Sequence, residues 1–411
     1  MSGEYSNNHY VPQWYQNRFV PQSSRDRELW YLELNPSSFR DGRGDLHQRT
    51  GLHRWGFRKC FAEPDLYTTR FGGIESRELE KQFFGAIDDE GKKAIDYFSE
   101  FAQPSAHPSA FQWLIQYMST QKLRTPKGLD WLASQVGADG RDVLLYEMAR
   151  SRQLFCALWT ECVWQIADAT QSNTKFIVSD HPVTVYNRAC GPRKQWCRGP
   201  NDPPIHFQGT HTIFPLSLDK VLILTNLSWA RNPYLSPTSP RPNPRYLRDT
   251  FFNFMRIQTL RHLSEQEVRE INFIIKSRAY RYVGAAEQEW LYPERRISKS
   301  DWNVFGDGWL LMPDPRSLAH GGEMLVGYGD GSSDAMDAYG RRTFEAAYGM
   351  DDEQPEGYDR LSRFQGEFAR NFGPYRRGRA CFAGRLEEER DSDEMHAYYL
   401  SLAGRRGRRR T

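Results

Sequence analysis

The sequence lacks any long hydrophobic run. The longest uninterrupted aliphatic stretch is 221–224, whereas a membrane-spanning helix needs about 18 or more consecutive apolar residues. We therefore expect no transmembrane helix. The first twenty residues are polar and aromatic, a composition that predicts no signal peptide.

The sequence also has little excess charge and few cysteines. Its 55 basic and 52 acidic residues leave a formal net charge of +3, which excludes a strong overall electrostatic field for nucleic acid or a membrane. Six cysteines at irregular spacing in 411 residues are typical of reduced thiols rather than of a disulfide framework. We therefore expect a cytoplasmic protein with no membrane partner.

The composition is that of a folded protein of more than one part. Hydrophobic residues make up 39 % of the chain and there are 32 glycines, which is the ordinary range for globular domains. After about residue 286 the composition shifts toward Gly, Asp, Glu and Arg. We expect a domain over 1–286 and a partly disordered extension over 287–411. Part of 287–311, which contains Trp290, Trp302 and Trp309, is expected to dock on the domain.

Apolar residues recur at intervals of three and four in the middle of the chain. This spacing predicts helices over 75–98, 111–121, 129–136 and 142–169, with an interruption at Gly91 and a break at Arg124-Thr125-Pro126. Ser264 to Glu267 has the form of a capping box that begins another helix within 247–277. The middle of the domain is therefore expected to be helical.

Strand-forming residues flank this helical region. The predicted strands are 29–34, 175–178, 212–214, 221–224 and 280–283. The fold class is therefore α+β, with a helical middle region packed on a small mixed β-sheet and a loosely structured C-terminal extension.

Several short motifs together resemble a known bacterial family. They are His9 to Tyr15, the strand 29–34, Glu78 to Glu80, Arg124 to Pro126, Ser179 to Val183 and Phe214 to Ser217. Over about residues 8–285 the chain is similar to the domain of unknown function 4238, with Trp14 where Phe is usual and His181 where Asn is commoner. The resemblance implies domain limits and a bacterial, intracellular setting, but no reaction.

Asp180 and His9 are the first candidates for chemistry. Asp180 follows a hydrophobic strand and precedes His181-Pro182, so its carboxylate is expected at a strand end, either closing a turn or orienting His9. His9 lies beside aromatic residues that can tune its imidazole near neutral pH, or it pins the N-terminal segment by hydrogen bonds.

Arg124 is the third candidate. At a helix break it can offer a guanidinium fork to a phosphate or carboxylate, or pair with an acidic helix residue such as Glu80. No close Cys or His spacing indicates a metal site, although His9, Asp180 and His181 together are an open alternative. The cofactor is unknown.

The Arg-rich end, 405–410, is either a solvated tail or a weak, non-specific contact for nucleic acid. The leading functional hypothesis is a hydrolase or phosphodiester-cleaving enzyme with His9 as acid/base, Asp180 as its orienter or a ligand, and Arg124 as anion clamp. The alternative is a non-catalytic protein- or nucleic-acid-binding module. The sequence does not choose between an enzyme and a binding module.

Overall fold

The computed structural model of the chain describes most of the first 297 residues. The described residues are 7–67, 69–71, 74–76, 84–102, 107–137, 140–151, 155–160, 162–226, 229, 236–241, 257–297, 302, 305, 324–327, 329–336 and 343. The predicted extension over 287–411 lies largely outside them, and its Arg-rich end lies outside them entirely.

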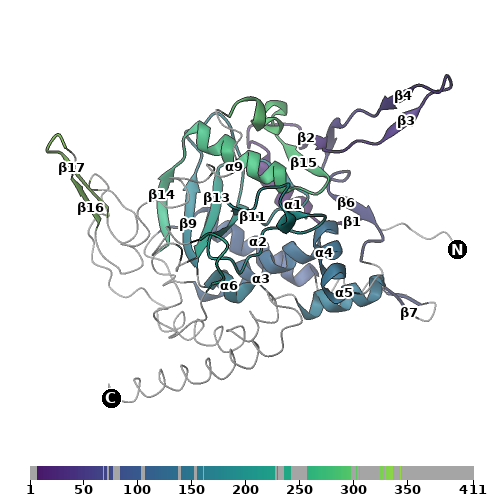
Figure 1. Cartoon of the computed structure of the whole chain (residues 1–411), viewed down its shortest axis with the longest axis horizontal. Helices are drawn as coiled ribbons and strands as arrows, with labels where there is room; N and C mark the ends of the chain where they lie inside the picture. Colours follow the sequence, from purple (N-terminus) through teal and green to yellow (C-terminus); the bar gives the residue numbers. More distant parts are fainter. Residues whose placement is uncertain are drawn as a thin grey trace, which may run out of the picture.

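Helices and strands alternate irregularly along the chain (Figure 1). The α-helices are α1 Gln13–Gln16, α2 Gly85–Ser99, α3 Pro108–Arg124, α4 Pro126–Val136, α5 Arg141–Arg150, α6 Cys156–Thr160 and α9 Glu265–Arg278. The strands are β1 Asn7–His9, β2 Glu28–Glu33, β3 Ser38–Arg40, β4 Leu46–Gln48, β5 Leu52–Gly56, β6 Ala62–Pro64, β7 Thr69–Phe71, β8 Ile74–Ser76, β9 Cys162–Asp168, β10 Val178–Ser179, β11 Thr184–Asn187, β12 Thr210–Pro215, β13 Lys220–Asn226, β14 Gln258–His262, β15 Tyr282–Ala285, β16 Met324–Gly327 and β17 Ser333–Met336. No helix among the described residues is both long enough and apolar enough to cross a bilayer.

Two sheets form the centre of the molecule. The larger one has the order β11-β12-β13-β9-β14, in which only β14 and β9 run parallel, and the smaller one has the antiparallel order β10-β15-β2-β5. Helices α2 to α6 gather on one side of the strands and α9 lies on the other (Figure 1). The α+β class and the mixed sheet predicted from the sequence are confirmed.

The sequence prediction for 142–169 is wrong at strand β9. The segment 142–169 was expected to be one helical block, but the structure ends its helices at Thr160 and continues as β9. All seven residues of β9 are buried, because it lies between β13 and β14 and is covered on both faces. A strand buried on both faces shows no alternation of polar and apolar residues, so its pattern is easily taken for a helix. Strand β14 likewise replaces helix in the predicted 247–277 region.

The helix break at Arg124-Thr125-Pro126 is confirmed, and so is the capping box at Ser264 and Glu267. The expected interruption at Gly91 is wrong, because α2 runs through it without a break. Gly91 is buried where α2 meets α3, and a Cβ there would lie 2.4 Å from Cδ2 of Tyr117. This glycine therefore permits close helix packing rather than ending a helix.

Both ends of the described region contribute to the core. Tyr10, Val11, Tyr15 and Phe19 are buried, so the N-terminal segment is part of the core. Beyond residue 286, Leu291, Trp302 and Phe305 join the same core, and the Trp302 indole donates to the Asn187 carbonyl at 2.9 Å. The chain therefore continues to pack on the domain past the compositional boundary.

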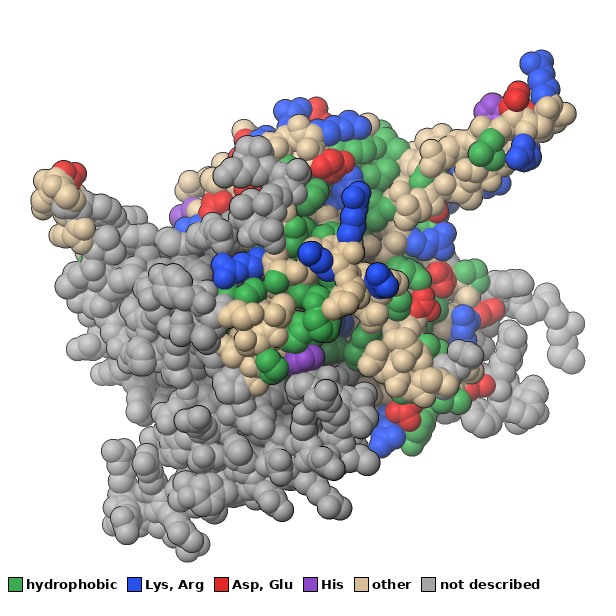
Figure 2. All heavy atoms as spheres, viewed as in Figure 1, with side chains coloured by type: hydrophobic (Ala, Val, Ile, Leu, Met, Phe, Trp, Pro, Cys, Tyr) green, Lys and Arg blue, Asp and Glu red, His purple; other side chains and the backbone are tan. Residues whose placement is uncertain are grey.

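The β3–β4 hairpin stands away from the body (Figure 1). Figure 2 shows charged side chains and one histidine close together near its tip. Phe39 and Leu46 on the hairpin are exposed. The hairpin is thus a surface feature that contributes nothing to the core.

Two glycines of α2 provide a matched test of this packing. Gly91→Ala should lower the free energy of unfolding by about 2 kcal/mol, because the overpacking against Tyr117 exceeds the gain in helix propensity. Gly85→Ala, whose Cβ would meet nothing within 4 Å, should leave stability unchanged or raise it slightly. Urea unfolding of both variants measures the difference, and equal effects would show that α2 and α3 are not in close contact at Gly91.

Candidate functional site

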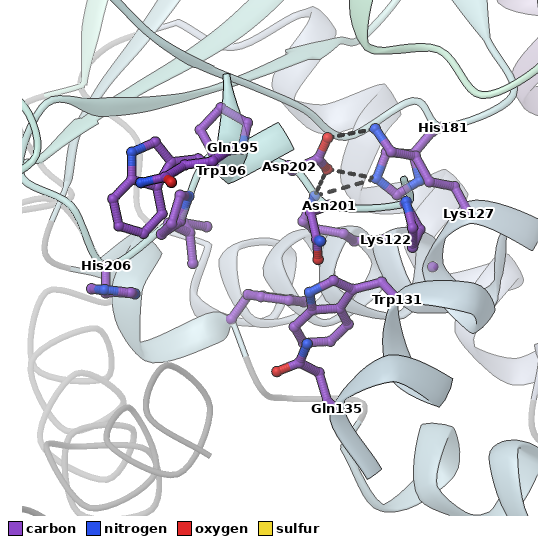
Figure 3. Close-up of a pocket in the computed structure, with 16 residues that line it drawn as sticks. Lys122, Lys127, Trp131, Gln135, His181, Gln195, Trp196, Asn201, Asp202 and His206 are labelled. Carbon is purple, nitrogen blue, oxygen red and sulfur yellow. Dashed lines mark hydrogen bonds and ion pairs between the residues drawn. The ribbon is translucent and has the colours of Figure 1, made fainter. Parts of the chain in front are cut away.

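A cavity of about 280 Å³ opens between the α3–α4 corner and the loop that precedes β12. Its walls are largely aromatic and proline-rich, and its charged side chains lie together with His181 at one end (Figure 3). The lining residues are Lys122, Lys127, Gly128, Trp131, Gln135, Phe155, His181, Gln195, Trp196, Pro200, Asn201, Asp202, Pro203, Pro204, Ile205 and His206. Pockets that combine apolar walls with a few convergent polar groups are the usual form of small-molecule sites.

Asp202 is the centre of the polar end. Lys122 Nζ lies 2.6 Å from its Oδ2 and Lys127 Nζ lies 2.5 Å from its Oδ1. The side chain of Asp202 is 11 % exposed, that of Lys122 is 9 % exposed and that of Lys127 is 7 % exposed. One buried carboxylate is therefore shared by two buried ammonium groups.

The helix break brings the two lysines together. On one continuous helix, positions five apart would point about 140° away from each other. Here α3 carries Lys122, α4 begins at Pro126, and Thr125 between them caps α4 by accepting from the Gly128 amide. A Cβ at Gly128 would lie 2.2 Å from the Lys122 carbonyl oxygen. Only glycine lets the start of α4 approach the end of α3 this closely.

His181 completes the cluster from the motif Ser179 to Val183. Its Nδ1 lies 2.7 Å from Thr125 Oγ1, and its Nε2 lies 3.2 Å from both Lys122 Nζ and Asp202 Oδ2. Figure 3 shows the imidazole beside both lysines at the same end of the cavity. The imidazole therefore bridges the helix break and the ion-paired carboxylate.

Burial and the neighbouring lysines set the charges of the cluster. Burial, reinforced by Lys122, lowers the pKa of His181 to about 3, so this imidazole is neutral at pH 7. Burial disfavours the Asp202 carboxylate, but Lys122 and Lys127 outweigh it and hold the pKa well below its ordinary value. Burial also lowers the pKa of Lys122, against the opposing effect of Asp202.

The two lysines retain donors for a further acceptor. Each ammonium has three N–H groups. Those of Lys122 are directed to Asp202 and His181, and those of Lys127 to Asp202 and the Arg278 carbonyl. With both lysines protonated and His181 neutral, these four side chains carry one positive charge in excess.

Asp180 lies next to His181 in sequence but serves another part of the fold. Its carboxylate accepts backbone amides of Tyr280, Arg281 and Tyr282 at 2.8, 2.5 and 2.9 Å. Burial raises the pKa of this carboxyl, although the three amides favour its charged form. Asp180 thus fixes the start of β15 beside β10 and does not line the cavity.

His9 and Arg124 lie elsewhere as well. His9 is half-buried, with Nε2 3.1 Å from the Phe57 carbonyl and Nδ1 3.5 Å from the Gln13 amide nitrogen. Arg124 is buried, and its guanidinium lies 2.8 Å from Asp88 and over the Phe84 and Tyr117 rings. Despite its burial, the pairing with Asp88 raises the pKa of Arg124. Neither residue lines the cavity.

Of the residues that do line the cavity, only His181 was a candidate from the sequence, as part of the alternative metal set. Lys122 and Lys127 flank the break at Thr125-Pro126, and lysines on both sides of a predicted helix break are a signal that could have been used. His181 was noted as a departure from the family pattern. Asp202 lies in a loop without regular periodicity, and nothing in the sequence indicates its partners.

Comparison with known proteins concerns the part of the chain that holds His181 and Asp202. Residues 148–289 match the model of the family described as "Protein of unknown function (DUF4238)". This part of the chain is therefore similar to that family. The matched range includes the motifs Ser179 to Val183 and Phe214 to Ser217 and begins after His9 and Arg124. No curated protein and no solved structure matches the chain.

Metal binding has little support in the described part of the chain. There, no group of three or more His, Cys, Asp or Glu side chains is placed to hold a metal ion. The alternative in which His9, Asp180 and His181 share a metal is therefore not supported.

The neutral state of His181 predicts a pH dependence of stability. Because the unfolded imidazole takes up a proton near pH 6.5 and the folded one near 3, unfolding should become easier as the pH falls from about 6.5 to 4.5. Each such histidine contributes up to about 1.4 kcal/mol per pH unit. His181→Asn should remove one such contribution from the slope measured by urea unfolding at several pH values.

His211 serves as the matched control for that slope. Burial, with Arg241 and Arg188 nearby, also lowers its pKa to about 3, and it lies on β12 outside the cavity lining. His211→Asn should therefore remove an equal share of the slope. A slope that is the same in His181→Asn as in the unaltered chain would show that His181 is not neutral and buried.

Proposed function

We propose that this chain binds a small organic anion in the cavity lined by Lys122, Lys127 and Trp196. The observation that carries the proposal is the pair of buried lysines that share the single carboxylate of Asp202. Buried charge is costly unless it is paired, so an excess positive charge beside an open cavity favours an anionic guest. A carboxylate or phosphate group of the ligand would accept the remaining N–H groups of the two lysines.

The walls indicate the rest of the ligand. Trp131, Phe155 and Trp196 lie around the cavity, and Trp196 is 41 % exposed although it contacts Phe207 edge to face. Such surfaces suit a flat or apolar group attached to the acid. The proposed ligand therefore has an acidic group at the lysine end and an apolar body against the indoles.

Binding of inorganic phosphate and of benzoate to the full chain tests this proposal by calorimetry. Lys127→Met should weaken the binding of both probes by tenfold or more, because it removes a charge-assisted hydrogen bond worth about 1.5–3 kcal/mol. Trp196→Ala should weaken benzoate and leave phosphate almost unchanged. Lys93→Met, an exposed lysine of α2 paired with Glu90, is the matched control and should bind both probes normally.

Two results would contradict the proposal. One is the absence of phosphate and benzoate binding at millimolar concentration. The other is binding that Lys127→Met and Lys93→Met reduce equally, which would indicate a general charge effect on the surface.

The hydrolase or phosphodiester-cleaving activity predicted with His9, Asp180 and Arg124 is a second candidate. One observation favours it: Gln13, the neighbour of His9, lines a surface hollow of about 390 Å³ together with Arg54, Arg58 and Lys59. Basic side chains near an imidazole suit a phosphodiester. A non-catalytic module for protein or nucleic acid is the remaining alternative, and its proposed contact at 405–410 lies outside the described residues.

The variant Asp180→Asn distinguishes a structural role of Asp180 from a charge pair between Asp180 and His9. If Asp180 acts only on the backbone of 280–282, an amide group facing those N–H donors should lower the free energy of unfolding by about 2 kcal/mol and leave the His9 titration unchanged. If it forms a charge pair with His9, the variant should lower the pKa of His9 in an NMR titration. An unchanged His9 pKa would show that Asp180 and His9 do not form a charge pair, and hydrolysis would then lose its main support.

A further inference from the structure

We infer that the Lys122 amino group captures a small 2-oxo acid as an imine, in an extension that rests on the anion site proposed above. The acid group of the ligand accepts the remaining N–H group of Lys127, and the carbonyl carbon of the ligand faces Lys122. The ligand is thus a 2-oxo acid, and Lys122 rather than Lys127 forms the covalent bond to it.

The two lysines differ in what their amino groups contact. Lys127 donates to the Asp202 carboxylate and to the Arg278 carbonyl, and both partners are oxygen atoms that accept hydrogen bonds. Lys122 contacts the same carboxylate and, at 3.2 Å, Nε2 of the His181 ring. An imidazole nitrogen can accept a hydrogen bond as well as donate one, so Lys122, unlike Lys127, has a neutral side chain beside it that can pass protons on during a reaction.

Burial and a second cation make the neutral amine of Lys122 easier to reach from its resting ammonium state, although the ion pair with Asp202 opposes this. Its side chain is 9 % exposed, a second cation shares its carboxylate, and its Nζ lies 5.8 Å from the centre of the Phe155 ring. Burial and a nearby cation are the conditions that activate catalytic lysines toward carbonyl compounds. The direction of the Lys122 pKa shift agrees with this arrangement.

The geometry sets the distance between the two reactive groups of the ligand. Lys122 and Lys127 bind the two oxygens of one carboxylate, so their amino groups lie within a few bond lengths of each other. A 2-oxo acid has its carbonyl carbon bonded directly to its carboxylate carbon. This short spacing matches the two lysines, and the aromatic walls receive the remaining part of the ligand.

The reaction balances without a further reagent. The neutral Lys122 nitrogen forms a bond to the carbonyl carbon while the C=O π electrons move to oxygen. The oxygen then leaves as water with the two protons from nitrogen, one of which can pass through His181 Nε2. The product is a C=N bond between Lys122 and the ligand, and nothing is oxidised or reduced.

Reductive trapping in the full chain tests the inference. Protein incubated at pH 7 with sodium pyruvate and sodium cyanoborohydride should acquire one stable adduct, which peptide mass spectrometry assigns to Lys122. We expect Lys122 to react at least tenfold faster than Lys93, the exposed lysine of α2. Lactate, which lacks the carbonyl, should give no adduct, and excess inorganic phosphate should slow the labelling.

The variants and the binding measurement distinguish the possible failures. Lys122→Arg should lose the fast adduct, with thermal unfolding checked in parallel, and Lys93→Arg should keep it. An adduct on Lys127, or labelling spread evenly over surface lysines, would overturn the inference. If phosphate binds in calorimetry but Lys122 is not labelled, the covalent role of Lys122 is contradicted and the anion site is supported. If phosphate does not bind and Lys122 is not labelled, the anion site and the covalent role are both contradicted.

Discussion

The Asp202 carboxylate is the interaction on which the arrangement of the candidate site depends. It joins Lys122 at the end of α3, Lys127 at the start of α4 and His181 after β10 to the loop that precedes β12. Lys127 extends the connection to the end of α9 through the Arg278 carbonyl. A buried carboxylate with these partners costs several kcal/mol to expose or to leave unpaired, so it holds three distant segments in one place.

The break between α3 and α4 and the fully buried strand β9 explain how the chain brings the residues around Asp202 together. Thr125-Pro126 ends α3 and starts α4 within one residue, and Gly128 allows the two helices to approach. Strand β9, buried on both faces, provides the rigid sheet against which Phe98 and Phe111 of α2 and α3 pack through Trp164. The polar cluster is therefore supported by apolar packing on one side and remains open to the cavity on the other.

The sequence predicted the features that are encoded locally. The strands at 212–214 and 221–224, the capping box of α9 and the helix break each depend on a few neighbouring residues, and each is confirmed. Strand β9 was missed because burial on both faces removes the alternation that identifies a strand. Lys122, Lys127 and Asp202 were missed because their proximity is created by tertiary contacts between residues 75 or more positions apart, and a loop aspartate does not indicate its partners.

The central claim is that two buried lysine ammonium groups face an anion site, and NMR of the lysine side-chain amino groups in the full chain tests it most directly. The account predicts two ammonium resonances that exchange slowly with water, are assigned to Lys122 and Lys127 by single Lys→Arg replacements, and shift on addition of inorganic phosphate. Surface lysines such as Lys93 should shift far less. Two rapidly exchanging resonances, or a phosphate response equal across all lysines, would contradict the account.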